Sequence, residues 1–316
     1  MNIAGLVGAL VPVFFVLALG YFAGKRNAFD ADQSAGLSKL ALNFALPASL
    51  FVSMTEIHKD LLLQQGRLVL ALVISHLGLF LAAWLLLRLV KSLRGTESII
   101  YALALATSAT PVFGFAVLEP LLGATAGAAV GLVALTINLT VPMAVVLLEM
   151  DAAGRRREAT GSSRQNPVLT GLSTGLKSPL LWGPILGITL TLTGHHLPTP
   201  VAACFELIGS ATSGVAVFAV GLVIAANSVR VSTGVVAGSL ARVSVQSALF
   251  FALVRLFHVV SPFAREALVC CSFPLATVVV LFAARYKAAE SESASMLLLS
   301  TLLLAFTVPA MMWVSK

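Results

Sequence analysis

Two stretches of sequence decide the fold of this chain: Ser108-Ala-Thr-Pro-Val-Phe-Gly114 and Ser272-Phe-Pro-Leu-Ala-Thr277. Each contains a proline that interrupts a long apolar segment, and the two lie at matching points of the two halves of the chain. In the hydrocarbon of a bilayer, irregular backbone persists only where protein surrounds it or where it lines a cavity, because an unpaired N–H or C=O group is costly there. Interrupted segments at corresponding positions therefore point to a transport site.

The composition is that of an integral membrane protein. Of 316 residues, 59% are hydrophobic and only 10% are charged, and the mean hydropathy is +0.99, whereas an ordinary soluble domain has about a quarter charged residues. A membrane-spanning helix needs about 20 mainly apolar residues. Ten stretches are plausible spans, and they start near Ile3, Leu37, Leu68, Ile99, Ala126, Leu180, Val201, Val235, Ala267 and Met296. The stretches at Leu37 and Leu180 are short or carry a charge, so nine and eleven spans stay alternatives. We therefore predict an all-α protein with ten transmembrane helices.

A polar stretch at residues 151–178, rich in Gly, Ser, Thr and Arg, divides the chain nearly in half. It predicts a first five-helix repeat at 1–150, a cytoplasmic linker, and a second five-helix repeat at 179–316. Because each half has an odd number of spans, the second half enters the membrane with opposite polarity, so the repeats are inverted. The interrupted helices are then the fourth and ninth, and they are expected to cross.

The distribution of basic residues predicts the orientation. Most of the 20 lysines and arginines fall in loops on one side of the predicted spans, and the positive-inside rule places that side in the cytoplasm. Both termini then lie on the extracytoplasmic side of the inner (plasma) membrane. The net charge of +7 is attributed to orientation in lipid and not to nucleic-acid binding.

The interrupted segments supply the first candidate site residues. Proline removes a backbone hydrogen bond and frees a carbonyl one turn back, and facing half-helix N-termini attract an anionic group. The predicted substrate-binding residues are Asn43, Pro47, Ser108, Thr110, Pro111, Gly114, Ser210, Gly214, Ser272, Pro274 and Thr277. A plain helix kink is the alternative interpretation of each proline, and hydrogen bonding between helices is the alternative for Asn43 and Ser210.

Four ionisable residues in predicted spans are candidate coupling or charge partners: Lys39, His76, Glu206 and Arg242. Lys39 and Glu206 lie near span ends, so extension to the membrane surface is an equal alternative. For His76 the alternatives are proton transfer and a bond to a neighbouring helix. Arg242 is one turn from Gln246 and could pair with a cargo carboxylate or with lipid headgroups.

No motif of an enzyme or of an ATP-driven pump is found. The chain has no Walker loop, no ordered Ser/His/Asp set, no HExxH, and no cysteine spacing typical of a metal site. We therefore predict a protein that is not an enzyme and needs no cofactor, with H⁺ or Na⁺ as coupling ion.

Several segments in a fixed order carry a family resemblance. They are Pro12-Val-Phe-Phe-Val-Leu-Ala-Leu-Gly-Tyr-Phe-Ala-Gly24, Asn43-Phe-Ala-Leu-Pro-Ala-Ser-Leu-Phe51, Pro111 with Gly114 and Phe115, and Pro274-Leu-Ala276 leading to Ala283-Ala-Arg-Tyr286. Over nearly its whole length the chain resembles the auxin efflux carrier family, and most closely the bacterial branch that includes malonate transporters.

The resemblance implies ten spans in two inverted repeats, a small organic anion beside the crossing prolines, an elevator-like motion of a transport domain against a scaffold, and often a homodimer. The chain departs from the family pattern at Val112, at Leu275 and at Gly214, where the family commonly has polar residues or a proline. Apolar residues at the crossing favour a more hydrophobic monocarboxylate over malonate.

The expected function is therefore secondary active transport of small organic anions by alternating access. Two alternatives stay open at this point. A sodium-coupled carrier of the bile-acid type would need further carboxylates or carbonyls around a cation, and deep Asp and Glu residues are scarce here. A membrane sensor would bind a ligand without moving it.

Overall fold

The computed structural model describes residues 3–56, 59–90, 93, 95–111, 113–114, 117–118, 126–160, 169, 173, 176–195, 197–226, 231–261 and 263–314. The regular structure in these ranges is helical, apart from one isolated antiparallel bridge between Ser108 and Leu275. The helices are α1 (Ile3–Lys25), α2 (Ala31–Leu40), α3 (Leu46–Thr55), α4 (Lys59–Gln64), α5 (Gly66–Val73), α6 (Leu79–Leu87), α7 (Thr96–Ala106), α9 (Ala126–Thr160), α11 (Pro179–Thr193), α12 (Thr199–Ala226), α13 (Thr233–Leu256), α14 (Ala264–Cys271), α15 (Thr277–Tyr286) and α16 (Glu290–Val314). Two π-helical segments, η1 (Ala41–Ala45) and η2 (Ile74–Gly78), join α2 to α3 and α5 to α6.

Six helical stretches among the described residues are long and apolar enough to cross a membrane: Ala31–Thr55, Gly66–Leu87, Gly127–Arg156, Thr199–Ala226, Thr233–Leu256 and Glu290–Val314. Shorter apolar helices occupy the other four predicted stretches, at Phe14–Lys25, Thr96–Ala106, Pro179–Thr193 and Thr277–Tyr286. The prediction of a helical membrane protein is confirmed, and the arrangement as ten spans in two inverted repeats stays a prediction. Helix α9 continues to Thr160, so the first part of the predicted linker is helical.

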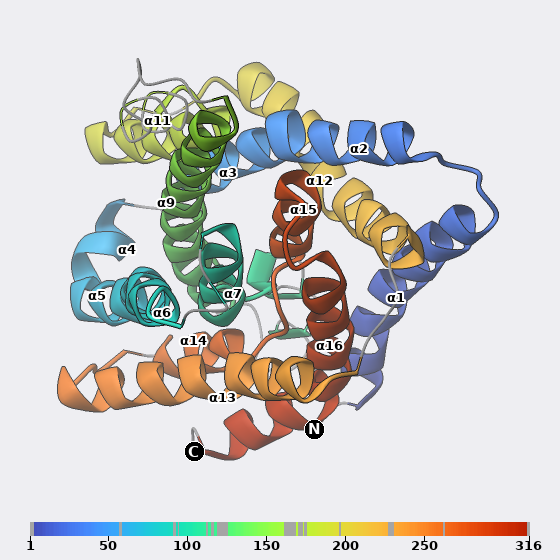
Figure 1. Ribbon diagram of the computed structural model, residues 1–316. Helices are drawn as coiled ribbons and strands as arrows, with labels where there is room; N and C mark the ends of the chain where they lie inside the picture. Colours follow the sequence, from blue (N-terminus) through green and yellow to red (C-terminus); the bar gives the residue numbers. More distant parts are fainter. Residues whose placement is uncertain are drawn as a thin grey trace.

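The helices form two groups (Figure 1). The first bundle, comprising α1, α2, η1, α3, α11 and α12, follows the top and right of Figure 1. Glycines bring its helices into backbone contact: a Cβ atom at Gly20 would lie 2.2 Å from the carbonyl oxygen of Phe218, and one at Gly183 would lie 2.7 Å from that of Pro47. Such close approach is how membrane helices gain packing energy without a hydrophobic driving force. The helices of the first bundle are therefore packed closely against one another.

The second bundle comprises α5, η2, α6, α7, α9 and α13 to α16, with α7 and α15 near the centre of Figure 1. Its interior holds large, fully buried aromatic side chains, namely Phe80, Phe113, Phe250, Phe273 and Phe282. The two bundles meet where α12 contacts α15 and where α3 and α11 contact α9.

The two interrupted segments cross inside the second bundle. Helix α7 ends at Ala106 and helical structure resumes at Thr110, while α14 ends at Cys271 and α15 begins at Thr277. Across the gap, the Ala109 N–H donates to the Pro274 carbonyl over 2.8 Å, and the Ala276 N–H donates to the Thr107 carbonyl over 3.4 Å. Each broken segment thus satisfies backbone groups that the other lost by leaving the helix.

The prolines act differently from the expected mid-helix kink. Pro111 lies in the first turn of the resumed helix, where its missing N–H breaks no helical hydrogen bond. Pro274 lies in the extended segment and accepts a hydrogen bond from the opposite chain segment. Each interrupted segment is therefore two half-helices with their own ends.

Candidate functional site

A cavity of about 540 Å³ lies beside the crossing, where the two bundles meet. Its walls come from α3, the first half of α9, and both crossing segments; the polar and crossing residues that line it are Ser49, Ser53, Glu56, Ser108, Ala109, Pro111, Asn138, Ala276 and Thr277. Most of the remaining lining is aliphatic, including Leu46, Leu50, Ile137 and Val141. Because Glu56 follows the end of α3 and Gly127 is at the start of α9, the cavity extends away from the basic loops, toward the other end of the molecule.

Two helix N-termini meet at this cavity. Helix α15 begins at Thr277, its N-cap residue Ala276 has no side chain that could cap it, and both residues line the cavity. The resumed helix begins at Thr110, and Pro111 in its first turn also lines the cavity. A helix N-terminus carries about half a positive charge and presents free N–H groups. The cavity therefore favours an anionic group at the crossing, with an apolar part against the aliphatic wall.

The opposite helix ends, the C-termini of α7 and α14, meet Arg242 of α13. This side chain is fully buried, and its guanidinium donates to the carbonyl of Leu105 over 3.3 Å and to that of Cys271 over 3.4 Å. It also donates to the Gln246 side-chain amide, which in turn donates to the Ala106 carbonyl over 2.9 Å. Helix C-termini carry partial negative charge, so Arg242 is neutralised by two helix ends. The alternative of lipid headgroups as its partners is excluded by its burial.

His76 lies in η2, behind the crossing, and is also fully buried. Its Nδ1 atom is 3.0 Å from the Leu72 carbonyl oxygen and 3.2 Å from the Ser75 hydroxyl. It does not line the cavity. Both contacts of Nδ1 stay within its own helix, and Nε2 has no hydrogen-bond partner among the described residues. Proton transfer and a bond to a neighbouring helix therefore both stay predictions for His76.

Comparison with known proteins identifies the family of this chain. A family model described as "Membrane transport protein" matches residues 6–312. The chain belongs to this family of membrane transport proteins. The resemblance to the auxin efflux carrier family is thereby confirmed. The chain is 28% identical over 313 residues to proteins named "Uncharacterized transporter YfdV" from Escherichia coli K12, Escherichia coli O157:H7 and Shigella flexneri, with 98% of each chain covered.

Three of the predicted substrate-binding residues of this transport protein line the cavity: Ser108, Pro111 and Thr277. Four others build the crossing without lining the cavity: Thr110, Gly114, Ser272 and Pro274. The Thr110 hydroxyl donates to the Cys270 carbonyl over 3.3 Å and lies 2.7 Å from the Ser108 hydroxyl. The Ser272 hydroxyl donates to the Val269 carbonyl over 2.7 Å. A Cβ at Gly114 would lie 2.7 Å from Val130, so this glycine allows close packing against α9.

The remaining predicted residues do not line the cavity. Asn43 accepts a hydrogen bond from Arg285 over 3.1 Å, and Pro47 packs against Gly183. Ser210, Gly214, Lys39 and Glu206 are exposed. Two runs of predicted residues are spaced four apart: Lys39, Asn43 and Pro47, and Glu206, Ser210 and Gly214. The first run turns toward Arg285 at Asn43 and toward α11 at Pro47, and the second run is exposed. Val112 lies outside the described residues, and Leu275 is buried without lining the cavity.

The sequence interpretation missed four polar residues of the cavity: Ser49, Ser53, Glu56 and Asn138. Ser49 and Ser53 are four residues apart on α3, a spacing that marks a second face of the same helix. The Asn138 amide donates to the Ser53 hydroxyl over 3.0 Å. Asn138 of α9 is therefore bonded to the neighbouring helix α3, and both residues of that bond line the cavity.

The cavity has a titratable group at its outer end. Glu56 follows the span that ends at Thr55, and burial, together with the negative charge of Glu206, raises the pKa of its carboxyl above the ordinary value. A raised pKa keeps the carboxyl neutral at pH values where an ordinary glutamate is ionised. Above that pKa, Glu56 carries a negative charge that repels an anion in the cavity.

We expect anion binding to weaken by about three- to tenfold as pH rises through the pKa of Glu56, because one charge is added at the cavity wall. Glu56→Gln removes this charge, so its affinity, expressed for the ionised form of the cargo, should not change across the same pH range. Glu206→Gln should move the midpoint to lower pH, because one cause of the raised pKa is lost. Half-saturating concentrations for uptake between pH 4 and 8 measure both effects; a Glu56→Gln profile like that of the wild type would contradict them.

Proposed function

We propose that this membrane transport protein is a secondary transporter that moves small organic anions through the cavity at the crossing. The observation that carries the proposal is the convergence of two helix N-termini on a cavity with an aliphatic wall. Such a site suits a carboxylate with a short apolar part. The cargo class is small carboxylates, namely malonate or a more hydrophobic monocarboxylate.

The mechanism proposed is alternating access between the two bundles. The first bundle, locked by glycine contacts, serves as the scaffold, and the second bundle carries the crossing and the cargo. In the proposed arrangement of ten spans in two inverted repeats, with the basic loops in the cytoplasm, the cavity lies on the extracytoplasmic side. The contact between Arg285 and Asn43 then joins the two bundles on the cytoplasmic side, as expected when access from that side is closed.

The contacts of Arg242 bear on the sodium-coupled alternative. In transporters with broken helices, half-helix C-termini and freed carbonyls bind the coupling cation. Here the carbonyls of Leu105, Ala106 and Cys271 already accept hydrogen bonds from Arg242 and Gln246. A fixed cationic side chain thus takes the place that a sodium ion would need. This supports coupling to protons through Glu56, or to the membrane potential, over coupling to sodium.

Counterflow in proteoliposomes tests the proposal. Vesicles are loaded with an unlabelled carboxylate and exposed to the labelled one, with a panel that includes malonate and several branched or aromatic monocarboxylates. We expect accumulation of at least one label, and no change in it when sodium is replaced by potassium. Binding of a carboxylate to the protein without counterflow would contradict transport and favour a sensor.

A further inference from the structure

A second hollow, of about 400 Å³, lies at the other end of α15, between that end and the last turns of α9. Four cationic side chains line it, Arg155, Arg156, Arg285 and Lys287, against the single carboxylate of Glu149. The cavity at the crossing contacts the N-terminal residues of the same helix, Thr277 and Val278. One pair of helices, α9 and α15, therefore contributes to both spaces.

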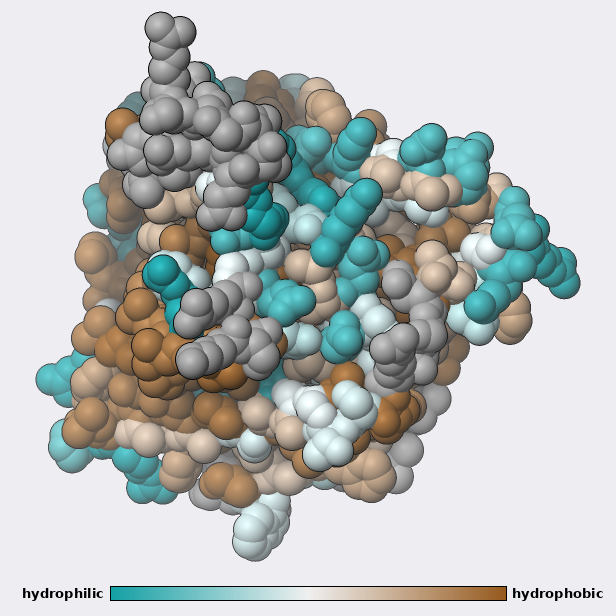
Figure 2. All heavy atoms as spheres, in the orientation of Figure 1, coloured by the Kyte–Doolittle hydropathy of each residue, from teal (hydrophilic) through white to brown (hydrophobic). Residues whose placement is uncertain are grey.

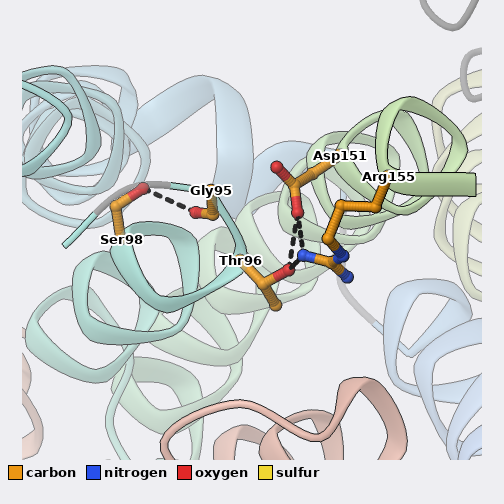
Figure 3. A network of polar contacts seen from close by, with 5 residues as sticks. All are labelled: Gly95, Thr96, Ser98, Asp151 and Arg155. Carbon is orange, nitrogen blue, oxygen red and sulfur yellow. Dashed lines mark hydrogen bonds and ion pairs between the residues drawn. The ribbon is translucent and has the colours of Figure 1, made fainter. Parts of the chain in front are cut away.

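Two acidic groups at or beside this hollow, Glu149 and Asp151, already have partners. Glu149 accepts a hydrogen bond from the Tyr286 hydroxyl over 2.6 Å and lies 3.6 Å from the guanidinium of Arg285. Asp151 accepts hydrogen bonds from Thr96, over 2.6 Å, and from Arg155, as Figure 3 shows. The four cationic side chains of the hollow thus outnumber these two carboxylates.

The position of the hollow favours a ligand dissolved in water over a lipid. Helix α15 packs against α2, α7, α12 and α16, so other helices flank it within the molecule (Figure 1). Figure 2 shows hydrophilic residues gathered over this central part of the face, whereas the hydrophobic surface lies over α5, α6 and α13. A lipid headgroup would be expected at that hydrophobic edge.

We propose that this hollow is a second binding site for the anionic cargo, occupied on the basic side of the protein before or after passage through the crossing. Guanidinium and ammonium groups bind carboxylate oxygens strongly, and the volume suits a small organic anion. This assignment rests on the proposed transport function, because the ligand assigned to the hollow is the cargo of that transport.

Lysine footprinting tests binding directly. The protein in nanodiscs of phosphatidylcholine is treated with an acetylating reagent, and the rates at Lys287 and at the exposed Lys25 are followed by mass spectrometry. Malonate should slow the modification of Lys287 several-fold and leave Lys25 unchanged. Inorganic phosphate at equal ionic strength, and nanodiscs that contain phosphatidylglycerol, serve as competing ligands. Protection by phosphate or phosphatidylglycerol and not by malonate would overturn the assignment to cargo.

A pair of double variants tests the role in transport. Arg156→Gln with Lys287→Gln removes two charges from the hollow, and Lys25→Gln with Arg26→Gln removes two exposed charges at the end of α1 as a matched control. In counterflow from the basic side, the half-saturating cargo concentration should rise several-fold in the first variant only. From the other side neither variant should differ from the wild type. Equal shifts in both variants would overturn the proposal, since they would reflect net charge alone.

The two proposals fail in different ways. Protection of Lys287 by malonate without counterflow of any carboxylate would refute transport, and with it the assignment to cargo. Counterflow without protection of Lys287 would refute the second site and leave the transport function standing.

Discussion

Arg242→Gln is expected to abolish transport and to lower the stability of the folded protein by about 2 to 6 kcal/mol, because the carbonyls of Leu105 and Cys271 lose their donors and each unsatisfied buried group costs about 1 to 3 kcal/mol. The two helix C-termini would also face each other without a cation between them. Arg242→Lys keeps the charge but not the planar fork that reaches both ends, so an intermediate loss is expected. The thermal midpoint in detergent and counterflow measure these effects.

The matched control is Arg255→Gln on the same helix. Arg255 is exposed and lies over the ring of Phe251 at 5.1 Å, an interaction that contributes about 0.5 to 1 kcal/mol at such sites. The Arg255→Gln variant should therefore keep both the transport rate and the thermal midpoint close to those of the wild type. An Arg242→Met variant as stable as the wild type would contradict the account, because methionine offers the helix ends no donor.

Gly131→Phe is expected to stop transport while the protein stays folded. Gly131 lines the cavity, and a side chain added there meets open space, with no atom within 4 Å of the new Cβ. The aromatic ring should therefore enter the volume assigned to the cargo. Replacing glycine inside a helix also removes an unfavourable helix former, so the thermal midpoint should not fall.

Gly154→Phe is the matched control for this blocking variant. Gly154 lies on the same helix α9, a Cβ there also meets no atom within 4 Å, and it does not line the cavity. We expect Gly154→Phe to take up cargo at the wild-type rate and Gly131→Phe to show only the background rate. Equal uptake by both variants would place the path of the cargo elsewhere.

The sequence predicted the breaks in the fold well, because they depend on local chemistry. Proline at residues 111 and 274 cannot continue a membrane helix without a partner for the freed backbone groups, and the structure shows helix ends at both places. The family resemblance followed from the order of several such segments. These features are properties of single segments and need no knowledge of how helices rotate against each other.

The lining of the cavity was predicted only in part, because it depends on which helix face points inward. Asn43 of η1 and Pro47 of α3 are one turn apart, as expected for a site, yet Asn43 contacts Arg285 and Pro47 packs against α11. Ser49 and Ser53, on a neighbouring face of the same helix, line the cavity instead. Glycine contacts between helices set this rotation, and they become visible only once both helices are placed.

The backbone partners of Arg242 could not be predicted from the sequence for a related reason. They are carbonyl groups at the ends of two half-helices that are distant in sequence, and no residue pattern marks such groups as partners of a particular arginine. Only the crossing brings these ends together.

The measurement that tests the central claim most directly is cargo protection of a cysteine in the cavity. Thr277→Cys is made in a background where the exposed Cys204 is serine, and the rate of modification by a negatively charged thiol reagent is measured with and without a carboxylate that shows counterflow. Ser210→Cys, exposed and outside the cavity, is the control. The account predicts that the carboxylate slows modification at residue 277 and not at residue 210. Equal rates with and without carboxylate at residue 277 would contradict it, because the cargo would then bind away from the crossing.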